Sequence, residues 1–147
     1  MNNIFQRLSI RVKNIDESIK FYSGVLGFKE KTRRQVLLSK ISGYPLSKKF
    51  PNTTLTLSIL SLDDFPTMLG LMSFGTNIPL DSAALVLLSN DIRKIENNFE
   101  KFGGKITMKI RKGSSINPNS GQKTPSYALM GLDPDEHFIE VIHFIKN

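Results

Sequence analysis

The chain has 147 residues, a formal net charge of +7 and no cysteine. This length fits one domain with its own hydrophobic core, and the lack of cysteine excludes disulfide frameworks, thiolate metal sites and cysteine nucleophiles. Residues 1–12 hold no apolar run long enough for a signal peptide or a membrane span. We therefore expect a single cytoplasmic domain.

The positive charge is spread along the chain. Lys and Arg occur at residues 29–34, 48–49 and 109–112, without interleaved aromatic residues and without a nucleic-acid-binding motif. Scattered charge is typical of a solvated surface, whereas nucleic-acid sites gather their charge in a patch. We expect partners that are neither nucleic acid nor membrane.

The first half of the chain begins with a strand and a helix. Apolar and polar residues alternate from Arg7 to Val12, which predicts a strand with Leu8, Ile10 and Val12 on the core. Apolar residues then recur four, three and four positions apart, which predicts a helix. Its expected buried positions are Ile15, Ile19, Tyr22 and Leu26.

The ends of this helix carry their own signals. Asn14 or Asp16 can cap the start, because a side-chain oxygen there can accept free backbone N–H groups. Gly27 can end the helix in the left-handed conformation.

The second half repeats the pattern, with a strand over residues 83–88 and then the start signal Asn90-Asp91. Apolar residues at helical spacing and a Gly103-Gly104 stop follow. The apolar positions of this second helix are Ile92, Ile95, Phe99 and Phe102. A repeat of this kind fixes the architecture before any motif is considered.

Three strand-like stretches follow each helix, at residues 28–37, 53–62 and 67–74 in the first half and at residues 105–111, 126–132 and 137–144 in the second. Each half therefore reads βαβββ. Placing Phe74 on Phe144 superposes the two closing strands and matches Gly70 with Glu140.

The halves are predicted to be modules of one α+β domain, residues 1–75 and 80–147, because neither alone covers both faces of its sheet. A joint is expected near residues 75–79. Residues 42–52 and 113–125 are rich in Gly, Pro, Ser and Asn, and they are predicted to be loops.

Two segments resemble the vicinal oxygen chelate superfamily, which includes glyoxalases, bleomycin-resistance proteins and extradiol dioxygenases. Residues 7–27 are similar to its opening strand and helix, with Phe-Tyr inside the helix and Leu-Gly at its end. Residues 132–141, Leu-Asp-Pro-Asp-Glu-His-Phe-Ile-Glu-Val, resemble its closing hairpin, although Glu136 replaces the usual glycine. The resemblance implies that the two modules form a half-barrel cavity.

The same resemblance implies four positions for the ligands of a divalent metal. They are a residue early in the first strand of each module and the Glu of each closing strand. In this sequence they correspond to Arg7, Ala84, Gly70 and Glu140. Arginine, alanine and glycine side chains cannot ligate a cation, so we expect neither a metal nor another cofactor.

The expected cavity lining follows from these positions and their neighbours on the same strand faces. It comprises Arg7, Ser9, Arg11, Met68, Gly70, Met72, Ala84, Phe138, Glu140 and Ile142. Hydroxyl residues Thr54, Thr56 and Ser58 are further candidates. The alternative is that these side chains fill the half-barrel and leave no cavity.

Glu140 needs a positive partner if it is buried, because an isolated buried charge costs several kcal/mol. Arg7 or Arg11 is the expected partner, in the space that a metal fills in relatives. This pair has two interpretations, a relic salt bridge or part of a ligand site.

The two histidines are not expected to form a site. His137 follows Asp135-Glu136 in the hairpin and is predicted to be exposed, whereas His143 is predicted to point away from Glu140 or to lie at the strand end. Asp133 and Asp135 are predicted to form the turn.

Two functional hypotheses follow. In the first, the chain is a metal-free protein that binds a small hydrophobic or aromatic molecule, with Arg7 and Arg11 suited to an acid group on it. In the second, it is a glyoxalase-type lyase or isomerase, or a dioxygenase, that uses a divalent metal. By analogy with relatives we also expect a homodimer.

Overall fold

The computed structural model describes residues 7–41, 45–63, 67–75, 83–117 and 120–145. The chain divides into two compact units, residues 1–23 with 27–81 and residues 24–26 with 82–147. No helix in the described ranges is long and apolar enough to cross a membrane. The organisation of both modules into one domain stays a prediction.

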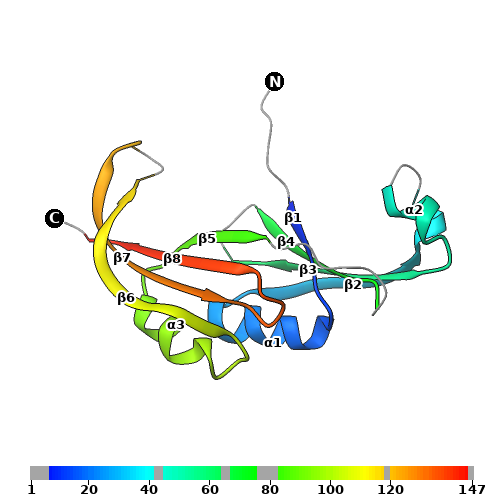
Figure 1. Cartoon of the computed structure of the whole chain (residues 1–147), viewed down its shortest axis with the longest axis horizontal. Coiled ribbons are helices and arrows are strands. Elements are labelled where there is room, and N and C mark those ends of the chain that lie inside the picture. The colour runs from blue at the N-terminus through cyan, green and yellow to red at the C-terminus, as the bar shows by residue number, and fades with distance from the viewer. Residues whose placement is uncertain (1–6, 42–44, 64–66, 76–82, 118–119, 146–147) are drawn as a thin grey trace. The chain divides into compact units, whose positions relative to one another are not determined.

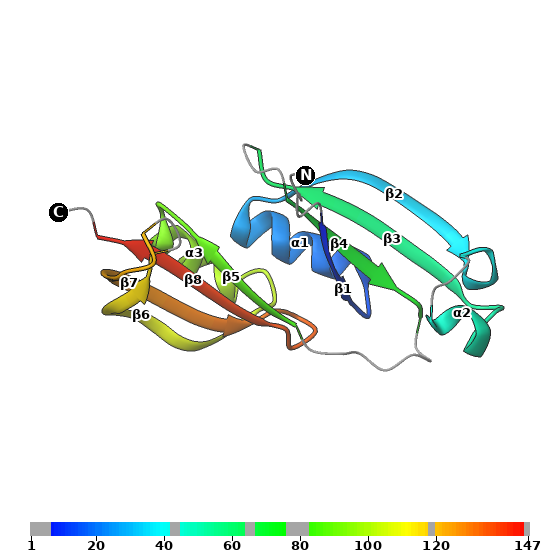
Figure 2. The same cartoon turned by 90° about the horizontal axis from the view of Figure 1, so that it is seen from above.

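The first unit contains one four-stranded sheet in the order β1-β4-β3-β2 (Figures 1 and 2). β1 runs parallel to β4, and the other neighbours are antiparallel. Its elements are β1 (Arg7–Arg11), α1 (Ile15–Leu26, of which residues 24–26 group with the second unit), β2 (Lys29–Leu37), the 3-10 helix η1 (Leu38–Lys40), α2 (Pro45–Lys49), β3 (Thr54–Ser61) and β4 (Met68–Ser73).

The second unit has the equivalent sheet order, β5-β8-β7-β6, again with one parallel pair, β5 and β8. Its elements are β5 (Ala84–Leu88), α3 (Ile92–Phe99), β6 (Lys105–Ile116), β7 (Lys123–Leu132) and β8 (Phe138–Phe144). The predicted α+β class with two βαβββ modules is therefore confirmed.

The strand registers agree between the units. Ser9 lies opposite Gly70 in the first sheet, and Val86 lies opposite Glu140 in the second. Two residues earlier, Arg7 lies opposite Met68 just as Ala84 lies opposite Phe138. These registers confirm the superposition of closing strands that the sequence predicts.

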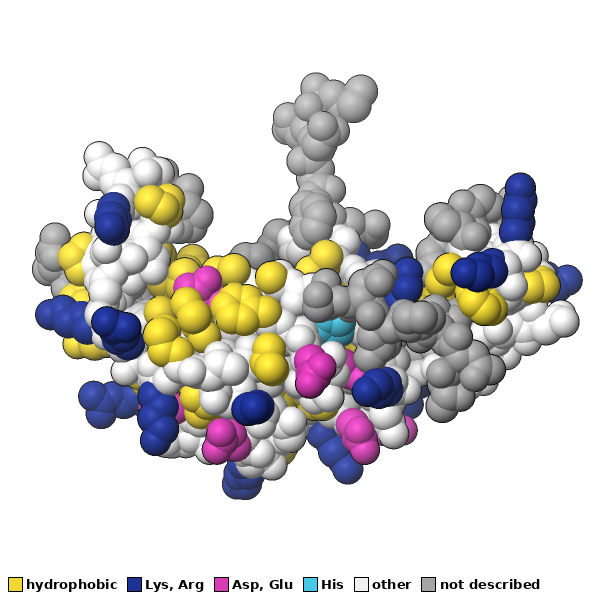
Figure 3. All heavy atoms as spheres, viewed as in Figure 1, with side chains coloured by type: hydrophobic (Ala, Val, Ile, Leu, Met, Phe, Trp, Pro, Cys, Tyr) yellow, Lys and Arg dark blue, Asp and Glu magenta, His cyan; other side chains and the backbone are white. Residues whose placement is uncertain are grey.

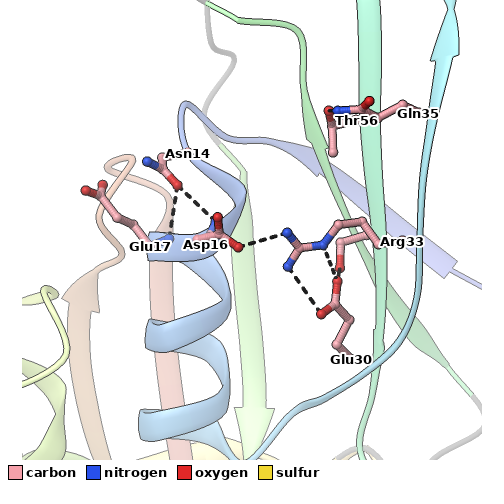
Figure 4. Close-up of polar contacts among 8 residues, drawn as sticks. Asn14, Asp16, Glu17, Glu30, Arg33, Gln35 and Thr56 are labelled. Carbon is pink, nitrogen blue, oxygen red and sulfur yellow. Dashed lines mark hydrogen bonds and ion pairs between the residues drawn. The ribbon is translucent and has the colours of Figure 1, made fainter.

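The caps of α1 are as predicted. The Asn14 side-chain oxygen accepts the backbone N–H groups of Asp16 at 2.9 Å and Glu17 at 3.2 Å (Figure 4). Gly27 follows the helix with φ 77°, which is the left-handed conformation.

The buried stripe of α1 differs from the prediction. Ile15 and Tyr22 are buried, but Ile19 and Leu26 are only half-buried. The buried side chains are Ile15, Ser18, Phe21, Tyr22 and Val25. The choice between Ile19 and Phe21 depends on how the helix rotates on its sheet, which spacing alone does not define.

One residue of strand β1 is less buried than its alternation predicts. Ile10 and Val12 are 3% and 1% exposed, but Leu8 is 37% exposed. Alternation fixes the face of a strand, whereas burial also depends on how far the covering elements extend along it.

α3 is attached to the outer strand β6. Asp91 caps the helix by accepting the N–H of Lys94 at 3.2 Å. The Glu96 carboxylate accepts the N–H of Ile110 at 2.8 Å, and Glu100 accepts that of Ile106 at 3.4 Å. Pairing with β7 is irregular over this part of β6, so these backbone donors are satisfied by the helix.

The two predicted loops contain more regular structure than their composition indicates. η1 ends just before the first predicted loop, and α2 lies within it. Residues 42–44 are outside the described ranges. In the second, β6 continues to Ile116 and β7 begins at Lys123. Pairing between the strands overrides the weak strand propensity of Gly, Ser and Pro there. In the predicted joint, residues 76–79 lie outside the described ranges.

Candidate functional site

Each sheet has a helix on one face, and the other face is called here its open face. In the first unit Arg33 lies opposite Ser58 and donates to Asp16 of α1 at 2.8 Å, which marks the helix-facing side (Figure 4). Residues that pair directly across strands share a face. The residues next to them in sequence therefore point to the open face. They are Arg7, Ser9, Arg11, Lys29, Thr32, Arg34, Val36, Leu55, Leu57, Ile59, Ser61, Met68, Gly70 and Met72.

Six predicted site residues therefore lie together on the open face of the first unit. Arg7 is exposed, and Ser9 and Arg11 are half-buried. Met68 and Met72 are half-buried beside the buried Gly70. Their strands β1 and β4 are adjacent and in parallel register, which places Arg7 beside Met68 and Arg11 beside Met72.

The space above Gly70 is occupied by side chains of β1. A Cβ atom at residue 70 would lie 2.5 Å from Ser9 Oγ and 3.1 Å from Arg7 Cδ. Any larger side chain at this position would displace both neighbours. The first unit therefore has no room for a carboxylate at residue 70 unless β1 side chains move.

The proposed hydroxyl lining of β3 is wrong. Thr56 lies opposite Ser73 and Ser58 lies opposite Leu71, so both face the helix side. Ser58 is buried and donates to Glu30 at 2.7 Å. Thr54 shares this alternation.

The β3 residues on the open face are instead Leu55, Leu57 and Ile59, and Arg34 of β2 lies opposite Leu57. Sequence reasoning missed these four residues. The alternation from Thr54 to Ile59 does predict two faces, but only the register with β4 shows which one Gly70 shares.

The segment between β2 and β3 packs on this open face. Leu38 of η1 is fully buried with Leu55, Leu57 and Ile59, and Phe74 completes the cluster. Further side chains packed against it are Val36, Ile41, Leu46, Phe50, Met68 and Met72. Figure 1 shows α2 on the side of the sheet opposite α1. One end of the open face is therefore covered by apolar side chains of the chain's own insertion.

The other four predicted site residues lie on the open face of the second unit. Phe138 and Glu140 are half-buried, Ile142 is 8% exposed, and Ala84 is exposed. Between them on β8, Ile139 and Val141 are fully buried on the helix side, as predicted.

Glu140 lies between Val86 of β5 and Met130 of β7. Hydrophobic side chains gather over this part of the second unit (Figure 3). The predicted pair of Glu140 with Arg7 or Arg11 joins residues of different units and stays a prediction.

His137 is buried, which corrects the prediction that it is exposed. Its backbone N–H donates to Asp133 Oδ1 at 2.8 Å, and its Nδ1 accepts the N–H of Ala83 at 2.9 Å. The imidazole therefore joins the β7–β8 hairpin to the start of β5. Position in a hairpin predicts exposure in general, but here the turn folds back on a neighbouring strand.

His143 lies near the end of β8, where its Nδ1 is 2.8 Å from the Ser89 carbonyl oxygen. It is three positions after Glu140, and an odd offset along a strand puts the two side chains on opposite faces, as predicted. Asp133 is buried and also accepts the N–H of Asp135 at 2.8 Å, so the predicted turn role of this aspartate is confirmed.

The residues at the four family metal positions do not suit a metal ion. Arg7 and Gly70 lie on the first unit and supply no ligand atom, and Ala84 on the second supplies none either. Glu140 alone offers a carboxylate. Within the described ranges, no group of three His, Asp or Glu side chains is placed to hold a metal.

Paired βαβββ units with matched registers define a class of proteins built from a duplicated module. The sequence matches the profile of the Glyoxalase/Bleomycin resistance protein/Dioxygenase superfamily over residues 4–141. The chain belongs to this superfamily, as the motifs predict. No curated protein matches it.

Solved structures share the fold at low sequence identity. A glyoxalase family protein from Bacillus cereus has a TM-score of 0.69 and 13% identity, and the match covers 99% of this chain and 97% of that one. An antibiotic-binding protein from Streptomyces sp. CB03234 has a TM-score of 0.62 and 16% identity, with 98% of each chain covered.

Maize (Zea mays) glyoxalase I has a TM-score of 0.61 and 20% identity. The match covers 97% of this chain but 45% of the maize chain, so the present chain spans less than half of that enzyme. At these identities the likeness establishes the fold alone.

Proposed function

We propose that this protein binds a small hydrophobic or aromatic molecule without a metal ion. The observation that carries the proposal is the set of residues at the family metal positions, where Arg7, Gly70 and Ala84 replace possible ligands. A site without those ligands cannot polarise vicinal substrate oxygens in the way that a bound metal does.

The open faces support binding of an apolar molecule. Met68 and Met72 lie half-buried on the first unit, and Met130 and Phe138 lie half-buried on the second. Methionine adapts its shape to different partners, and aromatic rings offer large apolar contact areas. The antibiotic-binding relative from Streptomyces supports the same class of function.

Elemental analysis of protein purified without chelators tests the metal-free part of the proposal. We expect less than about one-tenth of an equivalent of Ni, Zn, Fe or Mn per chain, because a single carboxylate holds such ions weakly. A ratio near one that is lost in Glu140→Ala would overturn it.

Binding is tested with a panel of aromatic and aliphatic compounds by calorimetry. Met72→Ala should weaken the best binder, and the exposed helix variant Lys20→Ala serves as the control. A panel without any binder at millimolar concentration, or a loss as large in Lys20→Ala, would contradict the proposal.

The second candidate function is a metal-dependent lyase, isomerase or dioxygenase of the glyoxalase type. The retained carboxylate of Glu140, on the closing strand where the superfamily has its metal-binding Glu, is the observation that favours it. The elemental analysis separates the two candidates, because this function requires a stoichiometric metal.

We also propose that the protein is a cytoplasmic homodimer. Val86 and Leu88 on the outer strand β5 are 59% and 58% exposed, and exposed apolar side chains on an edge strand favour association. Light scattering that gives a monomer at high micromolar concentration would contradict the dimer.

A further inference from the structure

The two units carry different charges around one equivalent position of their closing strands. Residue 140 in the second unit is a glutamate, and residue 70 in the first is a glycine with the Arg7 side chain lying beside it. The Cδ atom of Arg7 is 3.1 Å from where a Cβ of residue 70 would be. A Cβ there would also lie 2.5 Å from Ser9 Oγ, so the absence of a side chain at Gly70 leaves room for both the Ser9 and the Arg7 side chains.

Charges on the open face of the first unit have a single sign. Arg7, Arg11, Lys29 and Arg34 are the charged strand residues described there, and all are basic. Glu30 pairs with Arg33 near the helix, and Asp63, which follows β3, pairs with Lys29. Among the described residues of the first unit, neither Arg7 nor Arg34 pairs with a carboxylate.

The surroundings of these arginines are apolar. Met68 lies beside Arg7 on the neighbouring strand, and Leu57 lies between Arg34 and Met72 in one row across the sheet. The planar fork of N–H donors in a guanidinium matches a carboxylate, and the neighbouring apolar side chains can contact the apolar part of an acid.

We infer that Arg7, positioned by Gly70, binds the carboxylate of an apolar carboxylic acid lying on the open face of the first unit. The inference rests on the proposed function and deepens it by naming the ligand class. Arg7 makes the contact with the ligand, and Gly70 is a positioning residue that acts through Arg7. Where relatives use a cation to hold substrate oxygens, this unit uses a guanidinium.

The test compares two probes of nearly identical shape, biphenyl-4-carboxylate and biphenyl-4-carboxamide, by calorimetry at low salt. The wild-type protein should bind the acid about tenfold or more tightly than the amide, as a charge-assisted hydrogen bond contributes. Gly70→Ala and Arg7→Gln should lower the affinity for the acid to that for the amide, and they should leave the affinity for the amide unchanged.

The control is Gly113→Ala, another glycine on a strand, where an added Cβ meets no atom within 4 Å. It should change neither affinity. Circular dichroism melts check that the variants fold, and Arg7→Gln keeps the test valid if Gly70→Ala unfolds.

Equal losses for acid and amide in Gly70→Ala and Arg7→Gln would show that the two residues hold the shape of the face, and would overturn the inference. Unchanged acid affinity in these variants would overturn it too. A wild-type protein that binds acid and amide equally overturns the inference and leaves the proposed function standing. A wild-type protein that binds neither probe, nor any compound of the panel, overturns both.

Discussion

The two units have the same strand order and register but different side chains on their open faces. The row Ser9–Gly70–Ile59 of the first unit corresponds to Val86–Glu140–Met130 of the second. Their helix-facing sides are alike, since both bury aliphatic residues of the central strands against a helix. In this row the two modules therefore differ in the charge and size of their open-face side chains, although they share strand order and register.

The units also attach the helix to the outer strand in different ways. In the first unit Arg33 of β2 donates to Asp16 of α1 and, at 2.7 Å, to Glu30 (Figure 4). In the second, Glu96 of α3 accepts a backbone N–H of β6. One contact joins exposed side chains and the other satisfies a backbone donor, so their contributions to stability should differ.

The largest effect is expected on the helix-facing side. Phe99 is fully buried, and its ring occupies the space beside Gly131, where a Cβ would lie 2.5 Å from it. Phe99→Ala should lower the free energy of unfolding by about 3–5 kcal/mol, measured by guanidinium denaturation. The exposed open-face variant Thr32→Ala should stay within about 0.5 kcal/mol of wild type. Comparable losses of unfolding free energy in the two variants would contradict a larger contribution of the helix-facing residue to stability.

The next effect concerns the β7–β8 hairpin of the second unit. Asp133 is 3% exposed and accepts two backbone N–H groups, those of Asp135 and His137. Asp133→Ala leaves these donors without that acceptor and should cost about 2–3 kcal/mol in urea denaturation. Asp133→Asn keeps one acceptor oxygen and should cost less. If the asparagine variant is as unstable as the alanine variant, the hydrogen bonds are not the cause.

Replacing Glu96 should reduce the stability of the fold by an intermediate amount. Glu96→Ala removes the acceptor for the Ile110 N–H and should lower stability by about 1–2 kcal/mol. Glu96→Gln keeps an acceptor and should lose about half as much. Hydrogen exchange of the Ile110 amide provides the local readout. Unchanged protection in Glu96→Ala would contradict the proposed contact.

The exposed network of the first unit should contribute less and should depend on pH. The hydrogen bond from Arg33 lowers the pKa of Glu30 below its usual value, although partial burial opposes this shift. Arg33→Ala should therefore cost about 0.5–1 kcal/mol at pH 7.

Because the pKa of Glu30 is lower in the folded state, its stabilisation is present above the unfolded pKa of about 4.3 and is lost as the pH falls through the folded pKa. The difference between wild type and Arg33→Ala should shrink over that range. A difference that stays constant down to about pH 2 would contradict the assignment.

The smallest effect is a gain in stability. Glu136 has φ 68°, a left-handed conformation that costs energy for a residue with a Cβ, and the related hairpin motif has glycine at this place. Glu136→Gly should raise the melting temperature slightly, corresponding to about 0.5 kcal/mol, because the relief of strain exceeds the entropic cost of glycine. A lower melting temperature would show that the Glu136 side chain contributes to the turn.

Much of the fold could be predicted because its signals are local. Alternation, helical spacing and the caps at Asn14 and Gly27 each depend on neighbours in the chain, and the repeat then fixed which strands correspond. The rotation of α1 and the face of β3 that Gly70 shares depend on packing and register between distant segments. Sequence patterns carry little information about either.

Burial of His137 and the packing of Leu46 and Phe50 were missed for a different reason. Both lie in segments whose composition is typical of exposed turns, and tertiary contacts with Ala83 and with the cluster around Leu38 decide their burial. The residues at the superfamily's metal positions, in contrast, could be read from motifs, because the positions are tied to strand ends that the motifs mark.

The contacts between α3 and β6 also bear on the solubility of the protein. An outer strand with free backbone groups can recruit a strand from another molecule and so start an aggregate. On β6 the N–H groups of Ile106 and Ile110 are already bonded to Glu100 and Glu96. An incoming strand would have to break both bonds and approach the exposed side chains of Lys105, Lys109 and Arg111. The part of this edge around Ile106 and Ile110 is thereby less open to intermolecular strand addition.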